Sequence, residues 1–259
     1  MPELVISCLL ALGLLAQLPE KAPEVRVEAF LFERSTAEGV VPEAVVLLRS
    51  AGEDPSVPGF LLEQDVTFRD GGVTILHDEE VRETGWHMVR RELRSPGSTG
   101  RSFSAQPDGK GGLRVLRWGF NVPVHEHWSR PAPRLPLEVI HGWRNGTQEP
   151  GPLLIFDPLT EGPCLVRASL ETGDPRGEVE GEDTRTLTLR REDESLMGRY
   201  VFSGARLVAL QWRDGGGWAR RIEEREALRL VSRWRVERDP EAEAWAAIQA
   251  AKQSRRRAR

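Results

Sequence analysis

The most constraining feature of this sequence is a two-residue alternation of apolar and polar side chains that recurs in short segments along most of the chain. In the segment 25–29, valine and alanine occupy every second position, and Arg26 and Glu28 occupy the positions between them. This period is typical of a β-strand with one buried face, because successive side chains of a strand point to opposite sides. The segments with this pattern are 25–29, 44–49, 60–69, 73–77, 113–118, 184–191, 199–203, 205–213 and 228–237.

Most connections between these segments carry Asp-Gly or Gly-Gly. Glycine supplies the positive φ angles of tight hairpin turns, so we expect consecutive strands to pair antiparallel. A chain of 259 residues is long enough to bury a core without disulfide staples. The sequence therefore predicts a mainly β protein in which residues 25–237 form one antiparallel domain, a bent sheet or half-barrel with one solvated face.

Two helices are expected to interrupt this pattern. Asp239-Pro240-Glu241 offers an N-cap, a proline at the first helical position and an early acid, which predicts a C-terminal helix over 239–252. Asp157-Pro158 is expected to open a short internal helix through Ser169, which Gly162-Pro163 would break or kink. Residues 121–152 contain six prolines, which predicts a long connection between the halves.

The chain opens with an uncharged apolar stretch from Leu4 to Leu18. It is too short to span a bilayer but has the length of the apolar region of a signal peptide. We expect residues 1–18 to be a signal peptide and 19–24 a linker, which places the mature protein in the periplasm or cell envelope. Two alternatives stay open: lipidation of Cys8, and a buried N-terminal helix.

The charge balance excludes one class of partner. Lysine and arginine total 36 against 40 aspartates and glutamates, a formal net charge of −4, so the chain has no global field for drawing in nucleic acid. Basic residues are concentrated only in the tail, residues 253–259 with the preceding Lys252. We expect this tail to be solvated or to contact an anionic envelope surface.

A resemblance to a known group of proteins rests on three short segments: 153–160, which ends in Asp157-Pro158-Leu159-Thr160, then Leu165-Val166-Arg167, then Gly173-Asp174. Together they resemble a signature of uncharacterised bacterial periplasmic proteins. Those proteins are similar in architecture to the periplasmic lipoprotein carriers, in which an incomplete antiparallel barrel wraps over helices around an apolar cavity. The chain departs from the signature at Glu161-Gly162-Pro163, where the family would continue a helix.

One group of residues has the chemistry of a metal site. His125 and His127 would point the same way on an extended segment, and His141 lies downstream. Two imidazoles and a third ligand would leave an open position on zinc for a hydrolytic water, with Glu126 as general base. This is the alternative function, a metal-dependent hydrolase, and only under it would the protein need a cofactor.

No motif of a nucleophilic, nucleotide-binding or dinucleotide-binding enzyme occurs. The chain has eight tryptophans, of which we expect most to lie in the core. Trp128 and Trp143 fall in the proline-rich connection and are the best candidates for exposed, ligand-binding aromatics. We therefore expect a non-catalytic binding or carrier module that holds an apolar or amphipathic ligand between the concave sheet and the helices.

Overall fold

The structure is a computed structural model that describes residues 25–238, apart from residues 53, 70–72, 95–97, 119–123, 129–132, 158–161, 180, 182 and 213–216. Its strands form one antiparallel sheet of 14 strands, in the order β8-β7-β6-β5-β4-β3-β2-β1-β14-β13-β12-β11-β10-β9. Among the described residues, the first and last strands, β1 and β14, are therefore neighbours in the middle of the sheet. The predicted fold class, mainly β with antiparallel pairing in a strongly bent sheet, is confirmed.

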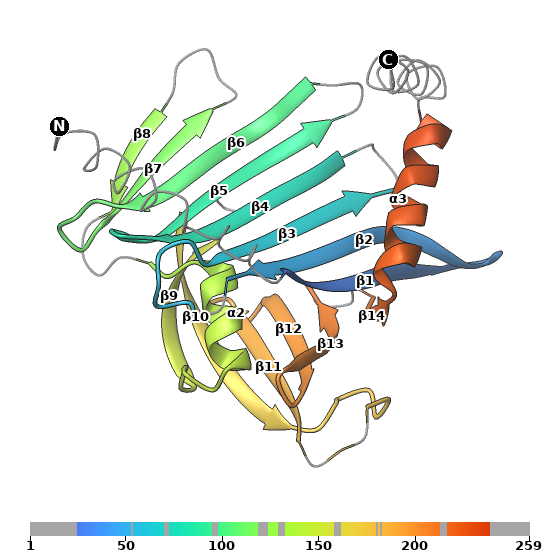
Figure 1. The fold of residues 1–259 in the computed structure, drawn as a ribbon. Coiled ribbons are helices and arrows are strands. Elements are labelled where there is room, and N and C mark those ends of the chain that lie inside the picture. Colours follow the sequence, from blue (N-terminus) through green and yellow to red (C-terminus); the bar gives the residue numbers. More distant parts are fainter. Residues whose placement is uncertain are drawn as a thin grey trace, which may run out of the picture.

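The strands of the N-terminal part form a meander in which each pairs with the next, and Figure 1 shows them fanning out as one broad layer. They are β1 (Val25–Thr36), β2 (Gly39–Ala51), β3 (Leu61–Phe68), β4 (Val73–Arg82), β5 (Gly85–Arg94), β6 (Ser98–Pro107), β7 (Leu113–Trp118) and β8 (Val124–Trp128).

The remaining strands curve beneath that layer, and helix α2 (Pro136–Arg144) lies between the two parts (Figure 1). β14 pairs with β1 and so joins the curved part to the meander. The elements are β9 (Gly151–Asp157), β10 (Gly162–Thr172), β11 (Thr184–Arg191), β12 (Leu196–Ser203), β13 (Arg206–Gln211), β14 (Ala219–Ile222) and helix α3 (Glu224–Arg238).

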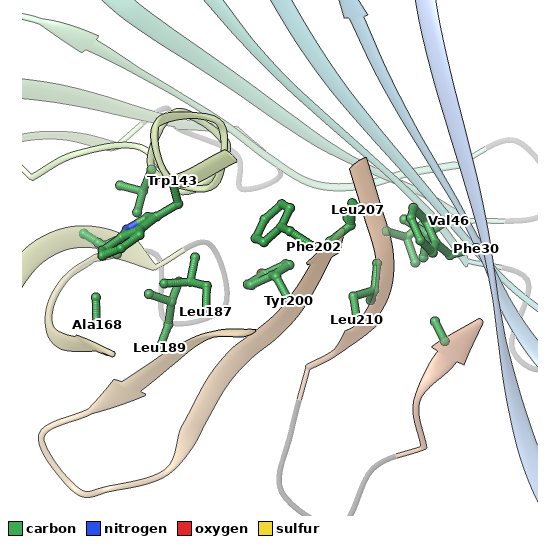
Figure 2. Close-up of a cluster of buried hydrophobic side chains, with 14 of the residues drawn as sticks. Phe30, Val46, Trp143, Ala168, Leu187, Leu189, Tyr200, Phe202, Leu207 and Leu210 are labelled. Carbon is green, nitrogen blue, oxygen red and sulfur yellow. The ribbon is translucent and has the colours of Figure 1, made fainter. Parts of the chain in front are cut away.

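The main core fills the concave side of the sheet. Phe30 and Val46 of the meander, Trp143 of α2, and Leu187 and Phe202 of the curved part belong to one cluster of buried side chains. Figure 2 shows these side chains converging from the three parts of the fold. The helix is thus held on the concave face by burial of apolar surface, the dominant favourable term in folding.

Helix α3 covers the convex face where β1 and β2 run side by side. Ala227, Val231 and Trp234 are buried there, and they follow one another at the spacing of one helix face. The prediction of a strand over 228–237 was wrong, because Leu228 and Val236, which suggested the alternation, lie exposed on the other side of the helix. Trp234 is buried as expected, at 2 % exposure, but on a helix.

The predicted internal helix from Asp157 to Ser169 is also wrong. β10 runs through this region and pairs with β9 on one side and β11 on the other. Val166 and Ala168 are buried while Leu165 and Arg167 are exposed, which is the period of a strand. Gly162-Pro163, where the chain departs from the family signature, therefore forms the start of β10, a position at which a proline is tolerated.

The stretch 121–152, predicted as a long connection, contains β8, α2 and the start of β9. α2 begins with Pro136 at its first turn, where a missing N–H costs nothing. The proline content of this stretch therefore marked a helix start in addition to loops.

The prediction that one face of β1 is solvated is also wrong at the centre of the sheet. Glu28 was placed on a solvated face, yet it is only 3 % exposed. The strand is buried on both faces from Glu28 to Phe32, because α3 covers one face and the concave core covers the other. A single solvated face therefore does not extend to the centre of this sheet.

The predicted signal peptide (1–18), linker (19–24), C-terminal helix (239–252) and basic tail (253–259) lie outside the described residues and stay predictions. No helix in the described part of the chain combines the length and the apolar character that a membrane-spanning helix needs.

Candidate ligand-binding cavity

A row of polar side chains crosses the concave face of the meander. Gln64 on β3 stands directly opposite His77 on β4, and His77 stands opposite Arg90 on β5. Directly paired residues of neighbouring strands share a face, so all three side chains point toward the interior. His77 and Arg90 are 4 % and 8 % exposed, and buried polar side chains of this kind are uncommon in a protein interior.

This row forms one wall of a cavity of about 160 Å³ beneath α2. The curved part of the sheet supplies the opposite wall, and the helix supplies a third. Most of the lining is apolar, with the polar row and one ion pair as the exceptions. The apolar lining residues are Val66, Phe68, Ile75, Pro136, Leu137, Ile140, Met197 and Trp212.

The ion pair in the cavity wall joins the ends of β9 and β11. Arg191 donates from Nε and Nη2 to Oδ2 of Asp157, at 3.0 and 2.9 Å. Asp157 is 1 % exposed, so its charge depends on this partner for compensation. Arg191 also donates to the backbone oxygen of Leu196 at 3.2 Å, which fixes the guanidinium at the wall.

The position of α2 in the cavity roof is set by Glu79 of β4, which is fully buried. Its carboxylate accepts the backbone N–H groups of Leu137 at 2.9 Å and of Glu138 at 2.6 Å. Leu135, the residue at the helix N-cap position, has no side-chain acceptor, so a carboxylate from a distant strand takes over the capping role. His77 Nε2 lies 2.9 Å from the same carboxylate, which ties the polar row to the helix start.

Tyr200 of β12 also lines the cavity, and its ring lies flat against the strand over Gly198. A Cβ at position 198 would come within 2.6 Å of the tyrosine oxygen and 2.7 Å of its ring. Burial raises the pKa of Tyr200, so the phenol stays neutral. The absence of a side chain at Gly198 therefore leaves the space that the Tyr200 ring occupies.

Two of the predicted site residues lie in α2. Trp143 was expected to be exposed but is 4 % exposed and belongs to the main core, so that expectation was wrong. Its position on the inner side of the helix explains this, because residues four apart, Val139 and Trp143, share one face. His141 is half-buried, and its Nε2 lies 2.8 Å from the side-chain nitrogen of Asn145. Burial and the neighbouring Arg144 lower the pKa of His141 to about 4, which keeps the ring uncharged at neutral pH.

The other predicted residues lie in β8. His125 and His127 stand opposite Leu116 and Arg114 of β7, and Trp128 stands opposite Leu113. The side chains of β8 lie outside the described part of the structure, so the predicted metal ligands and the ligand-binding role of Trp128 stay predictions. Among the side chains that are described, no three of His, Cys, Asp or Glu are grouped to hold a metal ion.

Sequence reasoning missed the groups that face the cavity. His77 and Glu79 lie on the same face of β4 as Ile75 and Val81, so two polar residues interrupt a row of apolar ones. That interruption in the sequence could have indicated a functional site on this face of the strand. The ion pair between Asp157 and Arg191 could not be predicted from nearby sequence, because the two residues are 34 positions apart and are brought together only by the sheet.

Comparisons with known proteins place the chain near one solved structure. A scan against protein-family models matches no family, and a search of curated proteins finds no relative. The chain is similar to the beta-barrel-like protein of domain of unknown function DUF1849 from Brucella abortus. The two share 10 % sequence identity with a TM-score of 0.48, and the match covers 78 % of this chain and 96 % of that one.

Proposed function

We propose that this protein is an exported, non-catalytic binding or carrier module of the cell envelope. It holds the apolar group of an apolar or amphipathic ligand in the cavity beneath α2. The observation that carries the proposal is the cavity itself, which lies between the concave sheet and a helix. Pockets with an apolar lining and a few converging polar groups are the usual sites for small molecules.

The size of the cavity limits what it can hold. Its volume of about 160 Å³ is close to the roughly 150 Å³ of an engineered apolar cavity that binds benzene. A ligand would therefore place one short chain or one ring there. Burying a methylene is worth about 0.8 kcal/mol, so a chain of about six methylenes gains roughly 5 kcal/mol, a submillimolar affinity before ordering costs.

The polar groups of the wall favour a ligand with a defined orientation. Gln64, His77 and Arg90 line one side, and Arg191 is fixed on the other by Asp157. A few placed polar groups in an apolar pocket select the direction in which an amphipathic molecule enters. The uncharged apolar stretch from Leu4 to Leu18 supports the export part of the proposal.

The experiment compares two variants of β4 that differ only in the face they change. Ile75 lines the cavity, whereas Leu76 points to the opposite face of the same strand. Calorimetry of the full chain with octan-1-ol is expected to show binding by the wild type and by Leu76→Phe, and strongly weakened binding by Ile75→Phe. Equal binding by all three proteins, or none by a folded wild type, would contradict the proposal.

A further inference from the structure

A second, smaller cavity of about 50 Å³ lies along the same helix, toward its C-terminal end. Leu137 and Ile140 line both cavities, so the two spaces abut at these side chains. A water needs roughly 10–15 Å³ of such space, so this cavity has room for a small oxyanion.

Three arginines converge on one carboxylate at this cavity. Glu28 is 3 % exposed and accepts two hydrogen bonds from Arg144, at 2.9 and 3.1 Å. Arg221 donates to the same carboxylate at 3.3 Å, and Arg26 Nη2 lies 3.5 Å from it. Three positive charges against one negative charge leave two in excess. Such an excess in a half-buried site favours a further anion.

The other charged groups at the cavity do not remove this excess. Arg49 and Glu63 also line the cavity, and Arg49 pairs with Asp65 and lies 4.0 Å from Glu63, so these three groups together contribute one negative charge and still leave a positive excess. His141 is uncharged at neutral pH, because burial and Arg144 lower its pKa to about 4. Burial also lowers the pKa of Arg144. The negative charge of Glu28 acts against this shift, and the positive charge of Arg26 adds to it.

The arginines retain donors for a ligand. Arg144 uses Nε on the backbone oxygen of Ala205, at 2.5 Å, and its other two nitrogens on Glu28. A guanidinium has more N–H groups than these contacts use, and its planar fork suits carboxylates and phosphates. Arg26 is half exposed at the rim, where an incoming anion would meet it first.

We propose that the small cavity is an anion subsite that binds the acidic head group of the ligand whose apolar group occupies the larger cavity. The inference rests on the proposed function and narrows the ligand to an anionic amphipath. Leu137 and Ile140, at the shared wall, would contact the part of the ligand that joins its head group to its apolar group.

The test compares octanoate with octan-1-ol, which share an alkyl chain but differ in charge. In calorimetry of the full chain at neutral pH, the ratio of octanoate to octan-1-ol affinity is expected to fall about tenfold in Arg26→Gln, the size of a lost charge-assisted hydrogen bond. Arg26→Lys retains the charge and is expected to keep most of the ratio. Arg167→Gln, which removes an arginine that is 74 % exposed on β10, serves as the matched control and is expected to keep the wild-type ratio.

The outcomes separate the two proposals. If octan-1-ol binds but the affinity ratio is the same in Arg26→Gln and Arg167→Gln, the anion subsite is wrong and the apolar cavity stands. If neither octanoate nor octan-1-ol binds the folded wild type, the proposed function fails and the subsite fails with it.

Discussion

Glu79 Oε2 accepts a hydrogen bond of 2.6 Å from the backbone N–H of Glu138, 59 positions further along the chain. This contact fixes the start of α2 against β4 and so sets the height of the cavity roof. The negative charge also meets the positive end of the helix dipole, which is a favourable arrangement. The site is therefore assembled by a long-range contact and not by its local sequence.

Replacement of Glu79 by alanine is expected to destabilise the protein by about 3 kcal/mol, because it leaves two backbone N–H groups of the helix start without their acceptor. Urea unfolding measures the change. The neighbouring Glu80→Ala is the control, because Glu80 points to the other face and pairs with the exposed Arg82. Equal losses in the two variants would contradict the capping role.

Trp234→Ala is expected to cost about 3–5 kcal/mol, the usual loss for a buried aromatic side chain. The indole packs between α3 and the convex face of the sheet at 2 % exposure. Leu228→Ala, on the exposed side of the same helix at 47 % exposure, is expected to change stability by no more than about 0.5 kcal/mol. A larger loss for Leu228→Ala than for Trp234→Ala in urea unfolding would show that the helix faces are reversed.

The sequence predicted those strands whose apolar and polar residues alternate clearly between turn residues. The strand over 184–191 agrees with β11 at both ends, since alternation and flanking turns mark it clearly. The same rule failed at α3, where Leu228, Leu230, Trp234 and Val236 alternate by chance within a pattern of helical spacing. α2 was missed because its cap comes from Glu79, which no window around Pro136 contains.

The cavity, too, was predicted from the sequence only in part. Its location between the sheet and a helix was expected from the resemblance to the lipoprotein carriers, but the predicted helix was placed at the wrong residues. The polar wall depends on register across β3, β4 and β5, which pairs Gln64, His77 and Arg90. Register is set by the turns and by the pairing of whole strands, so no short window around any one of these residues predicts it.

His141 makes stability depend on pH. Its pKa falls to about 4 in the fold from about 6.5, so the unfolded chain binds the proton more readily between these values. The stabilising contribution is therefore complete above about pH 6.5 and lost as the pH falls toward 4. Because the ring is only half-buried, we expect a loss of about 1 kcal/mol. Urea unfolding of His141→Gln at about pH 7 and about pH 4.5 should show a smaller decrease than the wild type, and an equal decrease would contradict the assignment.

Export predicts a shortened N-terminus. Protein recovered from its native cell is expected to begin between Gln17 and Ala22, after removal of the apolar stretch. N-terminal sequencing measures this directly. Intact Met1–Leu18 on protein from the cytosolic fraction would contradict the proposal.

The most direct test of the central claim uses the methionines as reporters. The chain has three, and Met197 lines the cavity, while Met88 is fully buried beside Phe103 and Val115 in a separate cluster. With ¹³C-methyl methionine in the full chain, titration with octan-1-ol is followed by NMR. We predict a saturable shift of the Met197 methyl resonance with the Met88 resonance unchanged. An unmoved Met197 resonance, or shifts of both methyl groups in parallel, would contradict binding in this cavity.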